Sequence, residues 1–523
     1  MRLTTVLLSV LGTLPVALSA SFKEYNFITP IDHFHNETRY EPHTNATFNL
    51  RYWFDATHYE PGGPVFVIAA GETSGEDRFE FLSQGIVTQL AETYHGLGVI
   101  LEHRYYGTSY PDDEDTVTTE GLRFLSTEQS LADHAYFAKH VVFPGLEDQD
   151  LTAPGTPWIA YGGSYAGAQV AFLRKVYPDI FWGSVSSSGV TAAIIDYWNY
   201  YEPIRTHGPA DCIDAIQTIT DMIDRILIDR PDEENLHAQL QATYGLSPPL
   251  NNTDFVNLLS QPLGSFQSRN WDPETGSYEF RHFCDNITAP APLYPPTNQT
   301  AILPKLVEKA GYNASDATLL ASIRNNIGYL NLSNPDQEGT STASSGNSTG
   351  RGLPKNSGTS WNYQVCTEWG YFMPGSSVPS SIRPLISRLI DLEYTSSFCA
   401  SDFGIPSPPD VQRINKHGGF NFSYPRVAII GGVADPWRDA TPLVTGYEER
   451  KSTDEEPFIL VSVDADHVWD GIAGAVHHWD QNGLSGEQVE AGERPPRVIE
   501  ELQGEIVRFV GVWLDDFEGE QDL

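Results

Sequence analysis

Short apolar segments alternate with amphipathic segments through the first part of the chain. Continuous apolar runs lie at residues 64–70 (PVFVIAA) and 158–161 (WIAY), which is typical of strands buried on both faces. Between them, residues 79–94 carry apolar side chains every three or four positions, as an amphipathic helix does. Ser126 and Gln129 have the spacing of a capping box and predict the start of another helix. This alternation predicts a mostly parallel sheet with helices on both faces.

The alternating pattern stops near residue 190 and resumes near residue 418. The intervening segment is irregular and partly helical, whereas residues 426–432 and 458–463 again read as buried strands. A final amphipathic helix is expected after Pro495-Pro496. We therefore predict an α/β-hydrolase fold with a large, mainly helical cap insertion. Its expected parts are a signal peptide (1–20), the first part of the α/β domain (21–190), a disulfide-bearing, glycosylated cap (191–417) and the second part of the α/β domain (418–523).

The first twenty residues have the pattern of a secretory leader. Arg2 supplies the positive charge, residues 6–16 are apolar, and residues 17–20 are small enough for a cleavage site. No later segment reaches the roughly 18 uninterrupted apolar residues that a membrane span requires. We expect a secreted, extracellular protein, with a vacuole or lysosome as the alternative compartment.

Cysteines and glycosylation acceptors agree with an oxidising, extracytoplasmic compartment. The four cysteines allow three pairings, of which we favour the sequential one, Cys212 with Cys284 and Cys366 with Cys399. No Cys-x-x-Cys motif occurs, which argues against zinc binding and dithiol redox chemistry. The Asn-x-Ser/Thr motif predicts glycosylation at Asn36, Asn45, Asn251, Asn286, Asn298, Asn313, Asn331, Asn347 and Asn421.

The chain is strongly acidic. Its 31 Lys and Arg residues oppose 69 Asp and Glu residues, giving a formal net charge of -38. Nucleic acid and anionic membranes are excluded as expected partners, because binding to them depends on clustered cations. Part of this negative charge would be neutralised in acid, which hints at an acidic working environment.

The sharpest chemical signal is the sequence Gly162-Gly163-Ser164-Tyr165-Ala166-Gly167. A serine between small residues, preceded by a short strand and followed by a helix, has the context of a nucleophile elbow. The alternative is a glycine-rich strand–helix turn with an incidental serine. We predict that Ser164 is a nucleophile.

A nucleophilic serine needs a base and a carboxylate that orients the base. In α/β-hydrolases the chain order is Ser, then Asp or Glu, then His. Asp435 follows the expected strand 426–432, and His467 follows the expected strand 458–463. Both would therefore project from the same sheet edge as Ser164, and we predict a triad of Ser164, Asp435 and His467.

Other residues compete for these roles. His477 and His478 lie in a segment that we interpret as helical, and they suit surface or packing roles better. The competing carboxylates, none of which directly ends a predicted strand, are Asp439, Asp464, Asp466 and Asp470. The oxyanion hole is expected from the backbone N–H of Tyr165 and that of Gly71 or Glu72, in the loop after strand 64–70.

Several blocks resemble the secreted serine peptidases of family S28, which includes lysosomal Pro-Xaa carboxypeptidase, dipeptidyl peptidase II and fungal acid prolyl endopeptidase. The blocks are GGPVFVIAAGE (62–72), LEHRYYGTSYP (101–111), LSTEQSLAD (125–133), GGSYAGA (162–168), DYWNYY (196–201) and ADPWRDA (434–440). The resemblance implies the same triad. In the family, a second histidine or a short polar pair commonly precedes an Asp, whereas Val468 and Trp469 precede Asp470 here.

The resemblance also implies peptide substrates that are cut after proline, often at acidic pH, and a homodimer in some members. Trp437, beside Asp435, is the expected wall of an apolar proline pocket. No metal or other cofactor is expected. The carboxypeptidase, dipeptidyl peptidase and endopeptidase modes stay open. Two other functions are considered, a secreted esterase or lipase and a catalytically inactive glycoprotein on the same scaffold.

Overall fold

The computed structural model describes residues 21–112, 114–333, 352–446, 450–462 and 474–521. Its centre is an eight-stranded sheet in the order β1-β2-β4-β3-β6-β7-β11-β12. β2 pairs antiparallel with both β1 and β4, and all the other neighbours are parallel. The strands are β1 (Tyr25–Pro30), β2 (Thr47–Asp55), β3 (Val65–Ala69), β4 (Leu97–Leu101), β6 (Trp158–Gly163), β7 (Gly183–Ser187), β11 (Val427–Gly432) and β12 (Phe458–Val461).

Two groups of helices cover the sheet. α2 (Ile86–Tyr94) packs against α16 (Arg497–Gln521), and the Tyr94 hydroxyl donates to the Val507 carbonyl at 2.6 Å. α3 (Thr127–His140) packs against α4 (Tyr165–Val176), which contacts β6 and β7. Strands β3 and β4 are buried along their whole length, as their continuous apolar sequences predict. The fold is an α/β-hydrolase fold.

Two local predictions are wrong in detail. The expected helix 79–94 is two helices, α1 (Phe79–Ser83) and α2, which are separated at Gly85. A Cβ at Gly85 would lie 2.5 Å from the Gln481 carbonyl oxygen, so the close approach of a distant segment breaks the helix there. Ser126 does cap α3 through the Gln129 N–H, but the Gln129 side chain binds Asp32 and His33 instead of completing a capping box.

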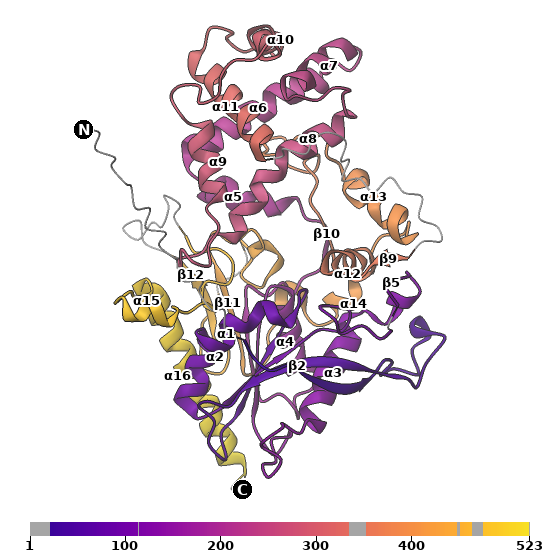
Figure 1. The fold of residues 1–523 in the computed structure, drawn as a ribbon, viewed down its shortest axis with the longest axis vertical. Helices are drawn as coiled ribbons and strands as arrows, with labels where there is room; N and C mark the ends of the chain where they lie inside the picture. The colour runs from indigo at the N-terminus through magenta and orange to yellow at the C-terminus, as the bar shows by residue number, and fades with distance from the viewer. Residues whose placement is uncertain (1–20, 113, 334–351, 447–449, 463–473, 522–523) are drawn as a thin grey trace, which may run out of the picture.

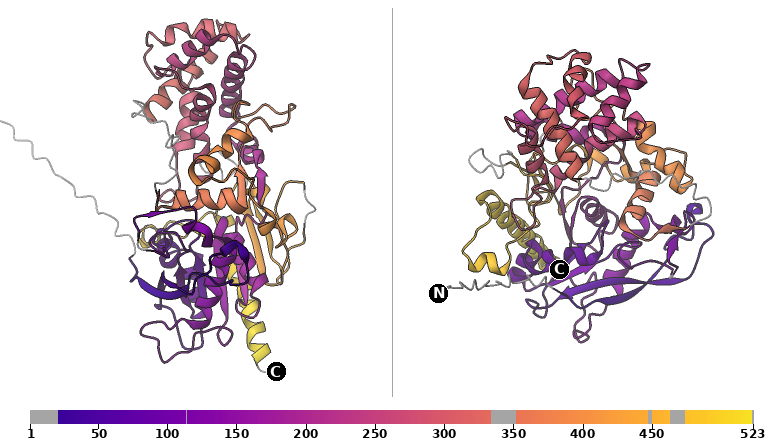
Figure 2. Two further views of the ribbon diagram at one scale, coloured as in Figure 1. Left: turned by 90° about the vertical axis from the view of Figure 1, so that its right-hand side faces the viewer. Right: turned by 45° about the horizontal axis from the view of Figure 1, so that its top comes forward.

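The inserted segment forms a layer of helices over one edge of the sheet (Figure 1), and the side view in Figure 2 separates this layer from the sheet domain. The limits of the cap at residues 191 and 417 stay predictions. Its helices are α5 (Glu202–His207), α6 (Ala210–Leu227), α7 (Glu234–Thr243), α8 (Asn252–Ser260), α9 (Glu279–Ile287), α10 (Leu303–Lys309), α11 (Ala317–Ser333), α12 (Ser357–Gln364), α13 (Leu392–Phe403) and α14 (Gln412–Asn415).

Short strands connect the inserted segment with its surroundings. β8 (Ile194–Asp196) pairs parallel with β10 (Gly370–Phe372), and β5 (Thr116–Val117) pairs antiparallel with β9 (Leu353–Pro354). The second pairing joins the insertion to the sheet domain. None of the described helices combines the length and the apolar character that crossing a bilayer requires.

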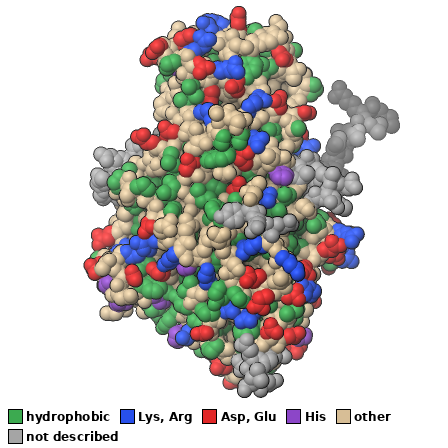
Figure 3. All heavy atoms as spheres, turned by 180° about the vertical axis from the view of Figure 1, so that it is seen from behind, with side chains coloured by type: hydrophobic (Ala, Val, Ile, Leu, Met, Phe, Trp, Pro, Cys, Tyr) green, Lys and Arg blue, Asp and Glu red, His purple; other side chains and the backbone are tan. Residues whose placement is uncertain are grey.

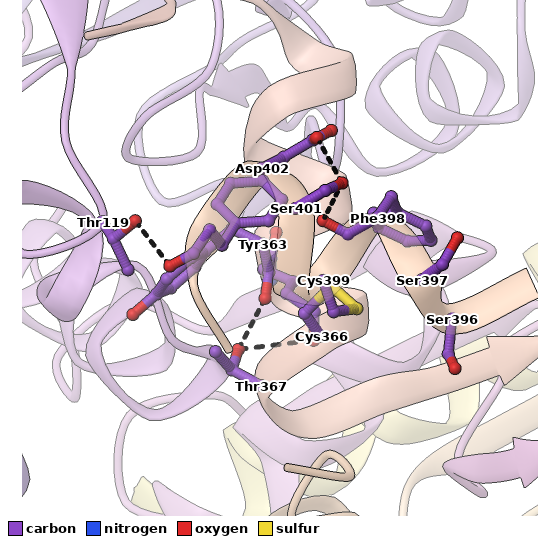
Figure 4. The surroundings of a disulfide bond; sticks show 12 residues. Thr119, Tyr363, Cys366, Thr367, Ser396, Ser397, Phe398, Cys399, Ser401 and Asp402 are labelled. Atoms are coloured by element: carbon purple, nitrogen blue, oxygen red, sulfur yellow. Dashed lines mark hydrogen bonds between the residues drawn. A yellow bond between two sulfur atoms is a disulfide. The ribbon is translucent and has the colours of Figure 1, made fainter. Parts of the chain in front are cut away.

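The favoured disulfide pairing is confirmed. Cys212 of α6 bonds Cys284 of α9, with Cα atoms 5.2 Å apart, and Cys366 bonds Cys399 of α13, with Cα atoms 5.5 Å apart. Figure 4 shows the second bond, with Thr119 of the sheet domain bonded to the backbone of α13 nearby. This disulfide therefore ties the segment after α12 to α13, and Trp369 of that segment packs edge to face on Tyr165 of α4.

The glycosylation motifs stay predictions. Seven of the nine asparagines are exposed, Asn286 is half-buried, and Asn347 lies outside the described residues. The predicted signal peptide also lies outside them.

Candidate active site

Ser164 occupies a sharp turn between β6 and α4. Its backbone has φ 56° and ψ -124°, a conformation that a non-glycine residue adopts only when the surrounding structure enforces it. A Cβ at Gly162 would lie 2.4 Å from the Ala166 carbonyl oxygen, and one at Gly163 would lie 2.8 Å from the His478 ring. The small residues before the serine are thus required by close contacts on both sides, as a nucleophile elbow demands.

Asp435 lies just after β11 and is almost fully buried. Its carboxylate accepts a hydrogen bond from the Trp437 N–H at 2.9 Å. Both carboxylate oxygens also contact His477 Nδ1, at 2.9 and 3.0 Å. Because a carboxylate only accepts, Nδ1 carries the proton and Nε2 is left free to accept one. This is the arrangement of an orienting acid and a catalytic base.

The residue paired with Asp435 is therefore His477. His467, the predicted base, lies outside the described residues. The helical interpretation of the segment around His477 and His478 is wrong, because residues 477–480 form a turn. The His477 side chain is only 8% exposed and faces Asp435, so a surface role is excluded. A signal was present in the sequence: in His477-His478-Trp479-Asp480 a second histidine precedes the Asp, whereas Val468 takes its place after His467.

His478 and Asp480 anchor the turn that carries His477. The Ser187 hydroxyl donates to Asp480 at 2.5 Å, and the Tyr161 hydroxyl also donates to this carboxylate. The His478 ring lies against that of His477, with centroids 3.7 Å apart. It also lies against Gly163, so the histidine pair sits beside the elbow. Burial, together with the charges of His477 and Arg78, keeps the pKa of His478 well below its usual value, so this second histidine is neutral.

The predicted oxyanion loop lies against the first turn of α4. Gly71 has φ +73°, and a Cβ there would lie 3.0 Å from the Ala166 Cβ. Tyr165 is the first residue of α4, where a backbone N–H has no partner within the helix. The structure thus brings Gly71, Glu72 and Tyr165 to one place beside Ser164.

The phenol of Tyr165 belongs to a buried chain of hydrogen bonds that the sequence did not reveal. Burial lowers the pKa of His103 to about 3, and its Nδ1 contacts the Arg104 carbonyl at 2.7 Å. Nδ1 is therefore the donor, and His103 Nε2 accepts from the Tyr165 hydroxyl at 2.9 Å. The same hydroxyl accepts from Gln364 Nε2 at 2.7 Å, and Gln364 Oε1 accepts from Tyr106. Each member of the chain is satisfied, which fixes the orientation of Tyr165.

Trp437 lies in an aromatic cluster next to Asp435. It stacks on Tyr197, with centroids 5.4 Å apart, and meets the rings of Tyr200 and Tyr371 edge to face. Its indole N–H donates to Gln267 of the cap at 2.9 Å. The tryptophan is half-buried, so part of its surface remains accessible. Its role in a substrate pocket stays a prediction.

Comparison with known proteins shows the family of the chain. Residues 29–464 match the family model described as serine carboxypeptidase S28. A probable extracellular serine carboxypeptidase of Arthroderma benhamiae is 46% identical over 506 residues, covering 95% of this chain and 68% of the relative. The serine protease vicPa of Bipolaris victoriae is 26% identical over 454 residues, with 80% of each chain covered. The lysosomal Pro-X carboxypeptidase of Homo sapiens is 26% identical over 490 residues, covering 88% of this chain and 86% of the relative. With most of its length matched, the chain belongs to the serine carboxypeptidase S28 family.

Proposed function

We propose that this member of the family is a secreted serine peptidase that cleaves peptides on the C-terminal side of proline through Ser164, His477 and Asp435. The observation that carries the proposal is the contact of His477 Nδ1 with both oxygens of the buried Asp435, at 2.9 and 3.0 Å. The neighbouring His478 ring lies against Gly163, which directly precedes a strained serine at the start of a helix. A strained serine next to a buried His–Asp pair is the arrangement that activates a hydroxyl for attack on a carbonyl.

In this mechanism the Ser164 hydroxyl attacks the scissile carbonyl while His477 Nε2 takes its proton. Asp435 holds the imidazole in the required tautomer and stabilises the positive charge that develops on it. His477 then gives the proton to the leaving amine, and an acyl-enzyme remains on Ser164. Water, activated by the same histidine, hydrolyses the acyl-enzyme and releases the second product.

The tetrahedral oxyanion would accept hydrogen bonds from the Tyr165 N–H and from the N–H of Gly71 or Glu72. Two supports for this role are the left-handed backbone at Gly71 and the close packing of its loop on Ala166. The N-terminus of α4 adds the positive end of a helix dipole at the same point. Such donors are worth about 10²–10³-fold in kcat each.

Proline specificity is supported by the aromatic cluster around Trp437, because flat aromatic rings can pack against the apolar ring of proline. The name of the human relative refers to Pro-X substrates, and two relatives are named as carboxypeptidases. We therefore propose removal of a single residue after proline as the main mode.

Secretion is supported by the leader sequence and by the relative named as extracellular. Acidic working conditions are supported by the net charge of -38.

The first test compares Ser164→Ala, His477→Ala and His467→Ala on N-blocked Ala-Pro-Phe between pH 4 and 7. Loss of the nucleophile or the base should lower kcat/KM by about 10⁶-fold. His467→Ala is the matched histidine control and should stay within about threefold of wild type. A large loss in His467→Ala with activity retained in His477→Ala would overturn the assignment of the base.

The esterase alternative needs a separate measurement. Wild type should hydrolyse the prolyl peptide and form a Ser164 adduct with a fluorophosphonate probe. Turnover of simple esters with the peptide left intact would contradict the peptidase proposal. The absence of both turnover and adduct would indicate an inactive scaffold.

A further inference from the structure

The loop that follows β3 carries two charged side chains for which the triad mechanism has no use. Glu72 comes directly after Gly71, and Arg78 lies six residues further on, just before α1. Glu72 Oε2 is buried and has no hydrogen-bond partner among the described residues. A buried polar atom without a partner is unfavourable and commonly marks a place where a ligand binds.

Arg78 is held across the same loop by one end of its side chain. Its Nε donates to the Ala70 carbonyl at 3.0 Å, and its guanidinium lies over the Phe81 ring. In the part of the chain that the structure describes, no carboxylate forms an ion pair with it. The two terminal nitrogens of this half-buried arginine are thus available to a bidentate acceptor.

Both side chains belong to the loop that packs against the nucleophile elbow, since Arg78 Nε binds the Ala70 carbonyl and Gly71 lies against Ala166. The positive charge of Arg78 helps to lower the pKa of His478 and opposes the rise in the pKa of Glu72 that burial causes. His477 acts on Glu72 in the same sense. Arg78 and Glu72 therefore belong to a loop beside Ser164, and their charges act on the histidine pair that serves the leaving amine.

The chemistry of the leaving group identifies the ligand. When a single residue is removed from the C-terminus of a peptide, only the α-carbon separates the leaving amine from a free carboxylate. A guanidinium beside the base is well placed to bind that carboxylate. We propose that Arg78 and Glu72 form a subsite that binds the free C-terminal carboxylate of the peptide substrate. This inference rests on the proposed function of the triad.

Within this subsite Glu72 adjusts the affinity with pH. The neutral carboxyl donates a hydrogen bond to the bound carboxylate, whereas the ionised carboxylate repels it. Burial raises the pKa of Glu72 although Arg78 and His477 oppose the rise, so the neutral form persists further toward neutral pH than in an exposed glutamate. Tyr106 and Tyr165, on whose hydroxyls the charge of Glu72 also acts, are the other titratable neighbours. Binding of the carboxylate is therefore strongest in acid.

The experiment compares N-blocked Ala-Pro-Phe with a free C-terminus and the same peptide as its C-terminal amide. Blocking the N-terminus removes any contribution from a substrate ammonium group. Wild type should have at least a tenfold lower KM for the free acid at pH 4.5. Arg78→Met should abolish this preference by raising the KM of the acid, and Arg78→Lys should restore part of it. Arg497→Met, at an exposed arginine of α16, is the matched control and should keep the preference.

The role of Glu72 is tested by the pH dependence of the same ratio. In wild type the preference for the free acid should fall as pH rises from 4.5 to 7, and Glu72→Gln should flatten this dependence. A fluorophosphonate adduct on Ser164 in each variant shows that the triad is assembled. Equal KM values for acid and amide in wild type, or an unchanged preference in Arg78→Met, would overturn the subsite. Failure of wild type to cleave either peptide or to form the adduct would instead overturn the proposed function.

Discussion

Individual residues of the site could be predicted from the sequence where the reactive side chain lies close to the end of a predicted strand. Ser164 and Asp435 directly follow β6 and β11, so the order of elements located both of them. His477 lies sixteen residues beyond the end of β12. Strand-end reasoning therefore selected His467, and the only local signal for His477 is the second histidine that follows it, because its contact with Asp435 is tertiary. Glu72 and Arg78 were hidden for the same reason, because isolated charges in a loop look like solvated ones.

The orienting role of Asp435 can be separated from that of its neighbour Asp439. Asp435→Asn keeps the shape of the side chain but stabilises the wrong tautomer of His477, so kcat should fall by about 10⁴-fold with little change in KM. Asp439, which accepts from the Thr445 N–H, faces Asn199 of the cap instead. Asp439→Asn should therefore keep kcat within about threefold. Equal losses in the two variants, measured on the same prolyl peptide, would contradict the orienting role of Asp435.

Secondary-structure elements were predicted best where periodicity and burial agree. Strands β3, β6 and β11 appear close to their expected positions, because buried parallel strands are continuous apolar runs. The gap between α1 and α2 was missed, since the Gln481 carbonyl that causes it comes from nearly four hundred residues away. Likewise, the hydrogen-bond chain from His103 through Tyr165 to Gln364 joins three segments that are far apart in the sequence. Sequence alone does not show that these segments lie side by side.

This chain of hydrogen bonds predicts a functional link between α12 of the cap and α4 of the sheet domain. Gln364→Leu leaves the buried hydroxyl of Tyr106 without a partner and removes the donor to the Tyr165 hydroxyl, which should cost about 1–3 kcal/mol of unfolding free energy in urea. Because Tyr165 also supplies an expected oxyanion donor, kcat should fall by about tenfold while KM changes little. Gln217→Leu removes a half-buried cap glutamine that donates to the Arg383 carbonyl and serves as the control. A loss of stability with kcat unchanged would show that Gln364 has only a structural role.

At the scale of the whole molecule, two electrostatic effects oppose each other in acid. Acidic side chains are spread over both the cap and the sheet domain, with basic side chains between them (Figure 3), and protonation of part of this excess relieves repulsion. Inside the molecule, burial lowers the pKa of His103 to about 3 and that of His417 to about 4, and it also lowers the pKa values of His134 and His478. These neutral histidines make acid less favourable for the folded state. The acidic working conditions proposed above therefore require that relief of surface repulsion offsets the effect of these histidines.

His417 allows the interior effect to be measured by itself. Its ring stacks on Phe172 with centroids 4.5 Å apart, so phenylalanine at position 417 should keep the packing and remove the titration. The pKa of His417 is lowered from 6.5 in the unfolded chain to about 4 in the folded protein, so the unfolded state binds the proton first as pH falls. Wild-type stability from this group is present above pH 6.5 and is lost on going down to about pH 4. His417→Phe should therefore gain on wild type by about 1.4 kcal/mol per pH unit, or about 3 kcal/mol in all, across this window.

Urea unfolding with the disulfides intact measures the difference, and Ile327→Val in the cap should show a cost that is the same at every pH. If the difference for His417→Phe were equally constant, this histidine would have to be protonated in the folded protein or equally buried in the unfolded chain, and the interior would not be what limits stability in acid.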